Sequence, residues 1–259
     1  MNNTNSHNIY PFLCDSHLHF NAKAANPLED LKKYLGNSIS FGTLILNTSD
    51  EYNFFRKSYE IDPEIFDNLF IVFGLNKNDF FIKEANEFAK NYKLKCGIKI
   101  HSRLFRINFS QLEWYFEEVK RYNPRVVVVD DFVYGNDVEE ELNITLACGL
   151  AEKLPDSKII LAHSGGAMLL NHVMRTKVYS NIFYDLSLTI NYMAGSSIDM
   201  DIQWMIRFMH SRTMLGSDYP DFTNEKAYQR LKELTSNKDF GKIVIDDLCV
   251  NTYRKVYLE

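Results

Sequence analysis

Cysteine is scarce in this 259-residue sequence, and its pattern excludes two kinds of small fold. The thiols lie far apart, and no two of them form a Cys-x-x-Cys pair. Neither a disulfide framework nor a zinc finger is therefore indicated. Isolated buried thiols in a reducing compartment fit better, so we expect a cytoplasmic protein. The cysteines are Cys14, Cys96, Cys148 and Cys249.

Basic stretches and long apolar runs are also missing. The formal charge is −5 and no basic stripe is visible, which argues against nucleic acid as a partner. No run approaches the roughly 18 apolar residues of a membrane span, and residues 1–8 lack the basic and apolar regions of a signal peptide. We expect a flexible leader over 1–11, one domain over 12–259 and a small-molecule partner. Association of identical chains stays open.

What the sequence does contain is eight short apolar runs separated by longer segments of helical period. The runs are rich in Ile, Val, Leu and Phe with little alternation of polarity, as expected for parallel strands covered on both sides. Eight strand–helix units in about 250 residues predict an α/β fold, a (β/α)₈ TIM barrel. An open doubly wound sheet is the alternative. The runs are Phe12–His19, Gly42–Thr48, Leu69–Asn76, Cys96–His101, Arg125–Asp131, Lys158–His163, Asn181–Ser187 and Thr213–Asp218.

Helix signals lie between these runs. Asn26 followed by Pro27 and an early glutamate predicts a capped start. Ser110 with the polar residues after it resembles a capping box. Acidic residues from Asp137 onward predict the first turn of a helix that reaches about Leu154. Further helices are predicted over 199–211, 224–235 and 242–257.

Polar residues follow several of the apolar runs, at the point where a strand would end. In the first run, alternation of side chains places Asp15, His17 and His19 on one face. Two neutral imidazoles so spaced can bind one cation, because Zn²⁺ accepts their nitrogens at about 2.0–2.1 Å. In a barrel all strand ends meet at one rim, which would bring these histidines together with the later candidates. Those candidates are Lys99, His101, Asp130, His163 and Asp218.

Five motifs on five predicted strands resemble, in order and spacing, the amidohydrolase superfamily. They are Asp-Ser-His-Leu-His at 15–19, Gly-Ile-Lys-Ile-His at 97–101, Leu-Ala-His-Ser-Gly-Gly at 161–166, Tyr-Asp-Leu-Ser at 184–187 and Leu-Gly-Ser-Asp-Tyr-Pro at 215–220. The nearest resemblance is to the amidohydrolase-2 branch, which includes aminocarboxymuconate-semialdehyde decarboxylase and pyrone-dicarboxylate lactonase. It runs from about residue 13 to the end.

The resemblance implies a role for each matching residue. His17 and His19 would bind a metal from the first strand. Asp218 would bind the metal and accept a proton from the attacking water. His163 would lie behind the metal or polarise the substrate. Lys99 and His101 would face the cavity and hold a substrate carboxylate.

One departure from the branch affects the metal. The branch usually places a histidine ligand at the end of the fifth strand, where this sequence reads Val126-Val127-Val128-Val129-Asp130-Asp131. Three readings stay open. Asp130, which alternation places inside the barrel, could complete a set of two His and two Asp for zinc or manganese. Lys99 could be carbamylated and bridge two metals. The metal could also be weakly held or absent.

The predicted activity is a metal-dependent hydrolase acting on an amide or lactone bond of a small, anionic substrate. Arg103 and Arg106 are candidates for binding the anion. The alternatives are a metal-independent lactonase or decarboxylase on the same barrel, and a barrel that binds a ligand without turnover. We expect no role in the site for His7, His172 and His210, and ordinary core packing for Trp114 and Trp204.

Overall fold

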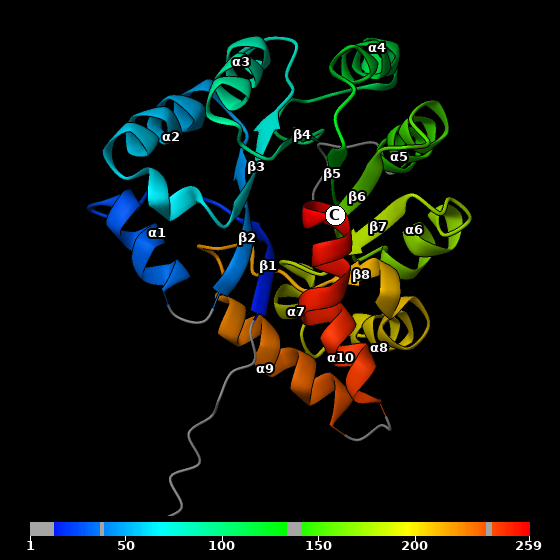
Figure 1. Cartoon of the computed structure of the whole chain (residues 1–259). Coiled ribbons are helices and arrows are strands. Elements are labelled where there is room, and N and C mark those ends of the chain that lie inside the picture. Colours follow the sequence, from blue (N-terminus) through cyan, green and yellow to red (C-terminus); the bar gives the residue numbers. More distant parts are fainter. Residues whose placement is uncertain (1–12, 37–38, 134–140, 237–239) are drawn as a thin grey trace, which may run out of the picture.

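The computed structural model describes residues 13–36, 39–133, 141–236 and 240–259. The predicted leader over 1–11 and the predicted acidic helix start near Asp137 lie outside these residues. The described chain forms eight parallel strands in sequence order, with helices packed around them (Figure 1). None of the helices in these ranges has the length and apolarity that a bilayer crossing requires.

Each predicted strand is present, within a few residues at its ends. The last strand is short, but the backbone beyond it continues to pair with the first. The Asp218 amide donates to the His17 carbonyl at 2.9 Å, and the His19 amide donates to the Tyr219 carbonyl at 2.8 Å. These bonds close the barrel, so the open-sheet alternative is wrong. The strands are β1 Leu13–Leu18, β2 Ile39–Leu46, β3 Leu69–Gly74, β4 Cys96–Ile100, β5 Val126–Val133, β6 Lys158–Gly166, β7 Ile182–Asp185 and β8 Thr213–Met214.

The helices form the outer layer, and two of their predicted starts can be checked. Asn26 caps the first helix as expected. The predicted capping box at Ser110 is wrong, because the residue that caps and is capped in return is Asn108, whose partner is Gln111. The helices are α1 Pro27–Leu35, α2 Ser49–Ile61, α3 Ile82–Tyr92, α4 Leu112–Tyr122, α5 Leu142–Lys153, α6 Leu169–Thr176, α7 Thr189–Tyr192, α8 Ile198–Met209, α9 Asn224–Thr235 and α10 Lys242–Asp246.

The end of the chain closes one mouth of the barrel. After α10 the helix continues with π-helical segments Asp247–Asn251 and Arg254–Leu258. Tyr257, in the second of these segments, and Tyr253, just before it, are buried with the side chains that fill the barrel interior. The Tyr257 ring lies 4.9 Å from that of Phe70. In Figure 1 the red C-terminal helix crosses the middle of the strand ring.

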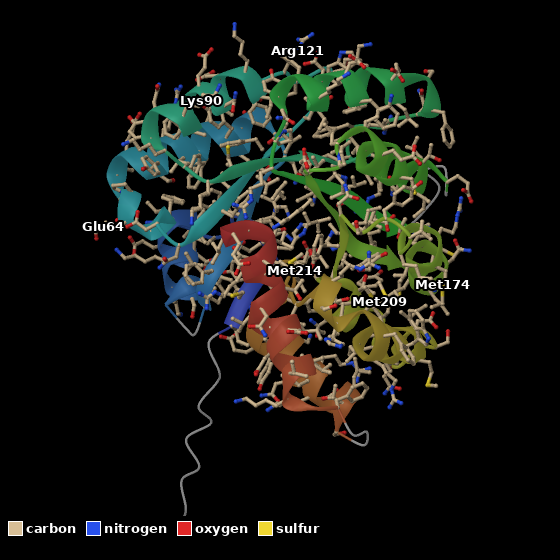
Figure 2. The ribbon with its side chains drawn as sticks, turned by 45° about the vertical axis from the view of Figure 1, so that its right-hand side comes forward. Glu64, Lys90, Arg121, Met174, Met209 and Met214 are labelled. Carbon is tan, nitrogen blue, oxygen red and sulfur yellow. The ribbon has the colours of Figure 1, made fainter. Side chains whose placement is uncertain are left out.

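Side chains divide cleanly between the interior and the outside. Met214 on β8 is fully buried inside the ring, whereas Glu64, Lys90 and Arg121 project from the outer layer (Figure 2). Because the C-terminal segment covers the amino-terminal mouth, the carboxyl ends of the strands form the opposite, open mouth. Catalytic residues of TIM barrels gather at that end.

Candidate active site

Strand β1 delivers two histidines to the open mouth, by means of an irregularity. Cys14 packs with the interior, whereas Leu13 and Leu18 pack with the helices. Strict alternation would turn residue 18 inward, but the register with β2 shifts between Asp15 and Leu18. The shift turns His17 and His19 inward together, as predicted. It leaves Asp15 outside that face, so the prediction that Asp15 shares it is wrong.

Each of three histidines has one ring nitrogen fixed by an acceptor behind the site. The His17 Nδ1 lies 3.1 Å from Asp185 Oδ2. The His19 Nδ1 donates to the Ile45 carbonyl at 3.2 Å, and the His163 Nδ1 donates to the Ser187 carbonyl at 3.0 Å. Because a carbonyl only accepts, Nδ1 carries the proton in both rings. The Nε2 atoms are left to face the centre of the site.

The Nε2 atoms of the β1 histidines converge on Asp218. The distance to Asp218 Oδ1 is 3.5 Å from His17 and 3.7 Å from His19. Burial lowers the pKa of His17 well below its usual value, and that of His19 to about 3, with the charge of Lys99 adding to the effect. Both rings are therefore neutral at pH 7, which is the form that binds a metal.

A buried carboxylate below the rim fixes the turn that carries Asp218. Asp15 accepts the Ser217 hydroxyl at 2.7 Å, the Ser217 amide at 2.9 Å and the Tyr34 hydroxyl at 2.6 Å. The backbone of Asp218 itself has a φ of 60°, a left-handed conformation that a side chain rarely adopts without support. Burial raises the pKa of Asp218, so its carboxylate is more basic than an exposed one.

A second carboxylate, Asp130 on β5, lies at the centre of a basic group. Its Oδ2 atom is 3.3 Å from Lys99 Nζ, 3.5 Å from His101 Nε2 and 3.4 Å from His163 Nε2. Burial opposes its ionisation, but these neighbours hold the pKa of Asp130 well below its usual value. The inward position of Asp130, predicted from the alternation of side chains on β5, is therefore correct. Asp131 faces outward, where its Oδ1 atom lies 2.9 Å from His172 Nδ1.

His163 and Lys99 link the two carboxylates. Burial opposes a charge on His163, but Asp218 and Asp130 outweigh it and raise the pKa of His163 to about 9. The Lys99 Nζ atom also lies 3.1 Å from His17 Nε2. His101 is partly exposed beside them, and burial lowers its pKa to about 4, although Asp130 opposes this. Five of the predicted residues thus meet around Asp130 and Asp218, namely His17, His19, Lys99, His101 and His163.

Three of these residues have the geometry of a cation site. Ligand atoms of His17, His163 and Asp218 lie within 4.8 Å of one another. The Nε2 atoms of His17 and His163 and one carboxylate match the donors that zinc accepts in a catalytic centre, and a cation would have to displace the proton that His163 holds at pH 7. Acceptors behind metal-binding histidines are the usual way of fixing the ring nitrogen that faces the ion. The residues present therefore fit a divalent cation. The role of Asp130 as a ligand stays a prediction.

A cavity of about 420 Å³ is lined by Phe132, near the end of β5, and by residues that follow β4, β7 and β8. Phe132 borders both the cavity and the histidines, since its ring lies edge-on to His163 at 5.9 Å and to Tyr192 at 5.6 Å. Arg103 lines the cavity, as expected of an anion-binding residue, whereas Arg106 is exposed and is not among the lining residues. The lining residues are Arg103, Phe132, Leu188, Tyr192, Asp221 and Phe222.

Several residues of the site were not predicted from the sequence, or were predicted in the wrong position. Asp185 was part of a motif but was given no role, and it accepts hydrogen bonds from His17, Ser16 and Ser187. Its signal was a lone carboxylate at the end of the apolar run 182–184. Asp15 was placed on the wrong face, and Phe132 has no signal that separates it from core residues.

No family model matches the sequence, and no curated protein sequence does either. Solved structures match the fold. A dihydroorotase from Campylobacter jejuni has a TM-score of 0.62 at 15% identity, over 95% of this chain and 83% of that one. An uncharacterized TIM-barrel protein from Bordetella bronchiseptica has a TM-score of 0.61 at 10% identity, over 90% and 82%. The chain is a TIM barrel.

A third neighbour of this TIM barrel carries a ligand. The phosphotriesterase homology protein from Escherichia coli, solved with phosphate in its active site, has a TM-score of 0.56 at 10% identity, over 95% of this chain and 97% of that one. At such identities the likeness concerns the fold. The resemblance to the amidohydrolase-2 branch stays a prediction made from the motifs.

Proposed function

We propose that this TIM barrel is a hydrolase of the amidohydrolase type, which cleaves an amide or lactone bond of a small carboxylated molecule with an activated water. The observation that carries the proposal is the convergence of His17, His163 and Asp218 at the open mouth of the barrel. The sequence motifs support it, because they contribute these same residues. The names of the neighbours, dihydroorotase and phosphotriesterase homology protein, also suggest hydrolysis.

The carboxylate of Asp218 moves the proton in the proposed reaction. Its raised pKa suits a group that takes a proton from water and gives it up again. As the water oxygen bonds to the substrate carbonyl carbon, Asp218 takes the water proton. It then passes the proton to the leaving nitrogen or oxygen as that bond breaks. Asp15, through Ser217, keeps the carboxylate in position for both transfers.

A divalent cation would be held by the Nε2 atoms of His17 and His163 and by Asp218, with His19 beside them. When bound, such an ion polarises a carbonyl and makes water ionise near neutral pH. Arg103 in the cavity wall is proposed to bind the substrate carboxylate. The rings of Phe132 and Tyr192 offer the apolar part of the substrate a surface in the same cavity.

Lys99 favours a second candidate, in which the same barrel works without a metal as a lactonase or decarboxylase. Its side chain is almost fully buried, and its Nζ atom lies 3.1 Å from His17 Nε2, where it competes with a cation for that lone pair. In this version the doubly protonated His163, with a pKa of about 9, donates to the substrate oxygen. Asp218 acts as the base in both versions.

Chelation distinguishes the two candidates. The protein is assayed on small lactones, cyclic amides and β-keto acids, before and after treatment with a chelator. Activity that is lost on chelation and returns with zinc supports the hydrolase with a cation, whereas activity that survives supports the second candidate. Asp218→Asn should lower turnover by about 10² to 10⁴-fold in either case. Asp50→Asn, on the exposed start of α2, is the control.

A fully active Asp218→Asn variant would contradict both candidates. Absence of turnover with all three substrate classes would favour the remaining alternative, a barrel that binds a ligand without reaction. Metal content measured on protein prepared without chelator gives an independent check. Less than about a tenth of an equivalent of transition metal, at full activity, would exclude the cation-dependent version.

A further inference from the structure

The wall of the cavity beside the histidines carries two opposite charges. Arg103, which follows β4, supplies a guanidinium, and Asp221, which follows β8, supplies a carboxylate. Both side chains line the same space of about 420 Å³. Among the residues that the structure describes, no ion pair joins the two. A wall that presents both charges is complementary to a ligand that carries both.

The two charges come from opposite sides of the open mouth. In a closed ring of eight strands in sequence order, β4 and β8 lie across from each other. Arg103 follows His101 by two positions. The Asp221 amide donates to the Asp218 carbonyl at 3.0 Å, so a tight turn joins the negative charge of the wall to the proposed base. A molecule held by both charges therefore crosses the mouth over the reacting groups.

Asp221 has no basic partner in the described part of the chain. The nearest lysine along the sequence, Lys226, forms no ion pair with it. Instead the Lys226 Nζ atom lies 4.6 Å from the centre of the Phe222 ring. The side chain of Asp221 is exposed where it lines the cavity. Its carboxylate is thus available to a positively charged group that enters from solvent.

The rest of the cavity wall is apolar or aromatic. Phe132, Leu188, Tyr192 and Phe222 line it between the two charges. The rings of Phe132 and Tyr192 meet edge-on at 5.6 Å. The volume lies within the range of roughly 300–1,000 Å³ that is typical of small-molecule sites. A ligand with an apolar side chain between its charged ends suits this wall.

We propose that the substrate is a small dipeptide with free ends and an apolar side chain. Arg103 binds its carboxylate, Asp221 binds its ammonium group, and the peptide bond between them lies over Asp218. The charged ends of an extended dipeptide are about 7 Å apart, which such a cavity accommodates. The hydroxyl of water bonds to the carbonyl carbon, its proton goes to the leaving nitrogen, and two amino acids are released.

This inference rests on the proposed hydrolysis and narrows its substrate. Three forms of alanyl-phenylalanine provide the test: one with free ends, one acetylated at the amino end and one amidated at the carboxyl end. Chromatography of the products gives kcat and KM for each form. The unchanged chain should cleave the free form with a kcat/KM at least about tenfold above either blocked form, because each block removes one charge-assisted contact.

Variants of the two charged residues assign each end of the substrate. Asp221→Asn should raise KM for the free form about tenfold, with little change in kcat, and should leave the acetylated form unaffected. Asp221→Lys should reverse the preference, so that a succinylated amino end is favoured over a free one. Arg103→Gln should weaken binding of the free and acetylated forms but not of the amidated form. Asp156→Asn, an exposed aspartate before β6 at the opposite mouth, is the control.

Failure of this inference differs from failure of the proposed function. Cleavage of lactones or acylated amino acids, with the free dipeptide cleaved no better than its blocked forms, overturns the dipeptide and leaves the hydrolase. Unchanged KM values in Asp221→Asn do the same. If no compound is cleaved, the hydrolase is wrong, and titration calorimetry with the three forms then tests the charges alone. Tighter binding of the free form supports this ligand class, and equal binding of all forms overturns it.

Discussion

The orientation of the imidazole rings that point into the site depends on the acceptors that contact their Nδ1 atoms. Asp185 accepts from His17, Ser16 and Ser187, and Ser187 in turn contacts His163. One buried carboxylate therefore orients two of the three residues proposed to hold a cation. Such partners behind a metal-binding histidine typically change metal affinity by about 10- to 100-fold when removed.

We expect Asp185→Asn to lower zinc affinity by about 10- to 100-fold, because the amide no longer fixes the His17 ring as a carboxylate does. The measurement is a titration with zinc against a competing chelator of known affinity. Asp131→Asn is a matched control, since Asp131 is also fully buried and paired with a histidine, His172, on the other face of β5. Equal loss of affinity in both variants would indicate general damage rather than orientation of His17.

At the same scale, the sequence predicted residue types better than their partners. His17, His19, Lys99, Asp130, His163 and Asp218 were found because polar residues after apolar runs are unusual. Asp15 was misplaced because a shift of register within β1 has no signature in one sequence. Asp185 was overlooked as a partner of His17 because that contact joins residues 168 positions apart.

Among the elements, the strands were predictable and the end of the chain was not. Strands buried on both faces must be apolar throughout, which leaves a pattern visible without any structure. The last helix was predicted over 242–257, but not that Tyr253 and Tyr257 enter the barrel. That packing depends on the width of the mouth, which no local pattern encodes.

Tyr257 should therefore matter more to stability than a terminal residue usually does. Its side chain is fully buried against Phe70 and the barrel interior. Tyr257→Ala should lower the free energy of unfolding by about 3–5 kcal/mol, since large aromatic side chains leave a cavity of that cost. Denaturant unfolding followed by circular dichroism measures the change. Ile61→Ala, at a position that is 75% exposed, should stay within about 0.5 kcal/mol.

A small effect of Tyr257→Ala would mean that the C-terminal segment contributes little to the closed mouth. Truncation before Tyr253 would then also be tolerated. The site at the opposite mouth offers a second readout. The segment lies at the mouth opposite to the site and contributes no residue to it. Loss of the segment should therefore reduce activity only by reducing the amount of folded protein, and the activity per folded molecule should not change.

For the whole molecule, closure of the ring brings residues from both ends of the sequence into one site. His17 and Asp218 are 201 positions apart in the sequence, yet their side chains lie 3.5 Å from one another. The number of strand–helix units predicted this closure, because eight units fill a ring and leave no free edge. It did not predict which substrate fits, since the cavity walls are loops that follow the strands.

The same closed packing divides the four thiols into two classes, and their reactivity reports the integrity of the barrel. Cys14 lies inside the ring and Cys249 beneath it, and each is only 2% exposed, whereas Cys96 and Cys148 are partly exposed. Burial raises the pKa of Cys14 and of Cys249 to about 12, so almost no reactive thiolate is present at pH 8.

With a colorimetric disulfide reagent we expect two thiols to react early and two to react only as the protein unfolds. The slow rate should rise with denaturant in step with the loss of circular dichroism, because a thiol inside a closed ring is reached only when the strands separate. Four thiols reacting at one fast rate would mean that the ring opens readily between strands. In that case residues from β1 and β8 could not be held together well enough to share one water or one ion.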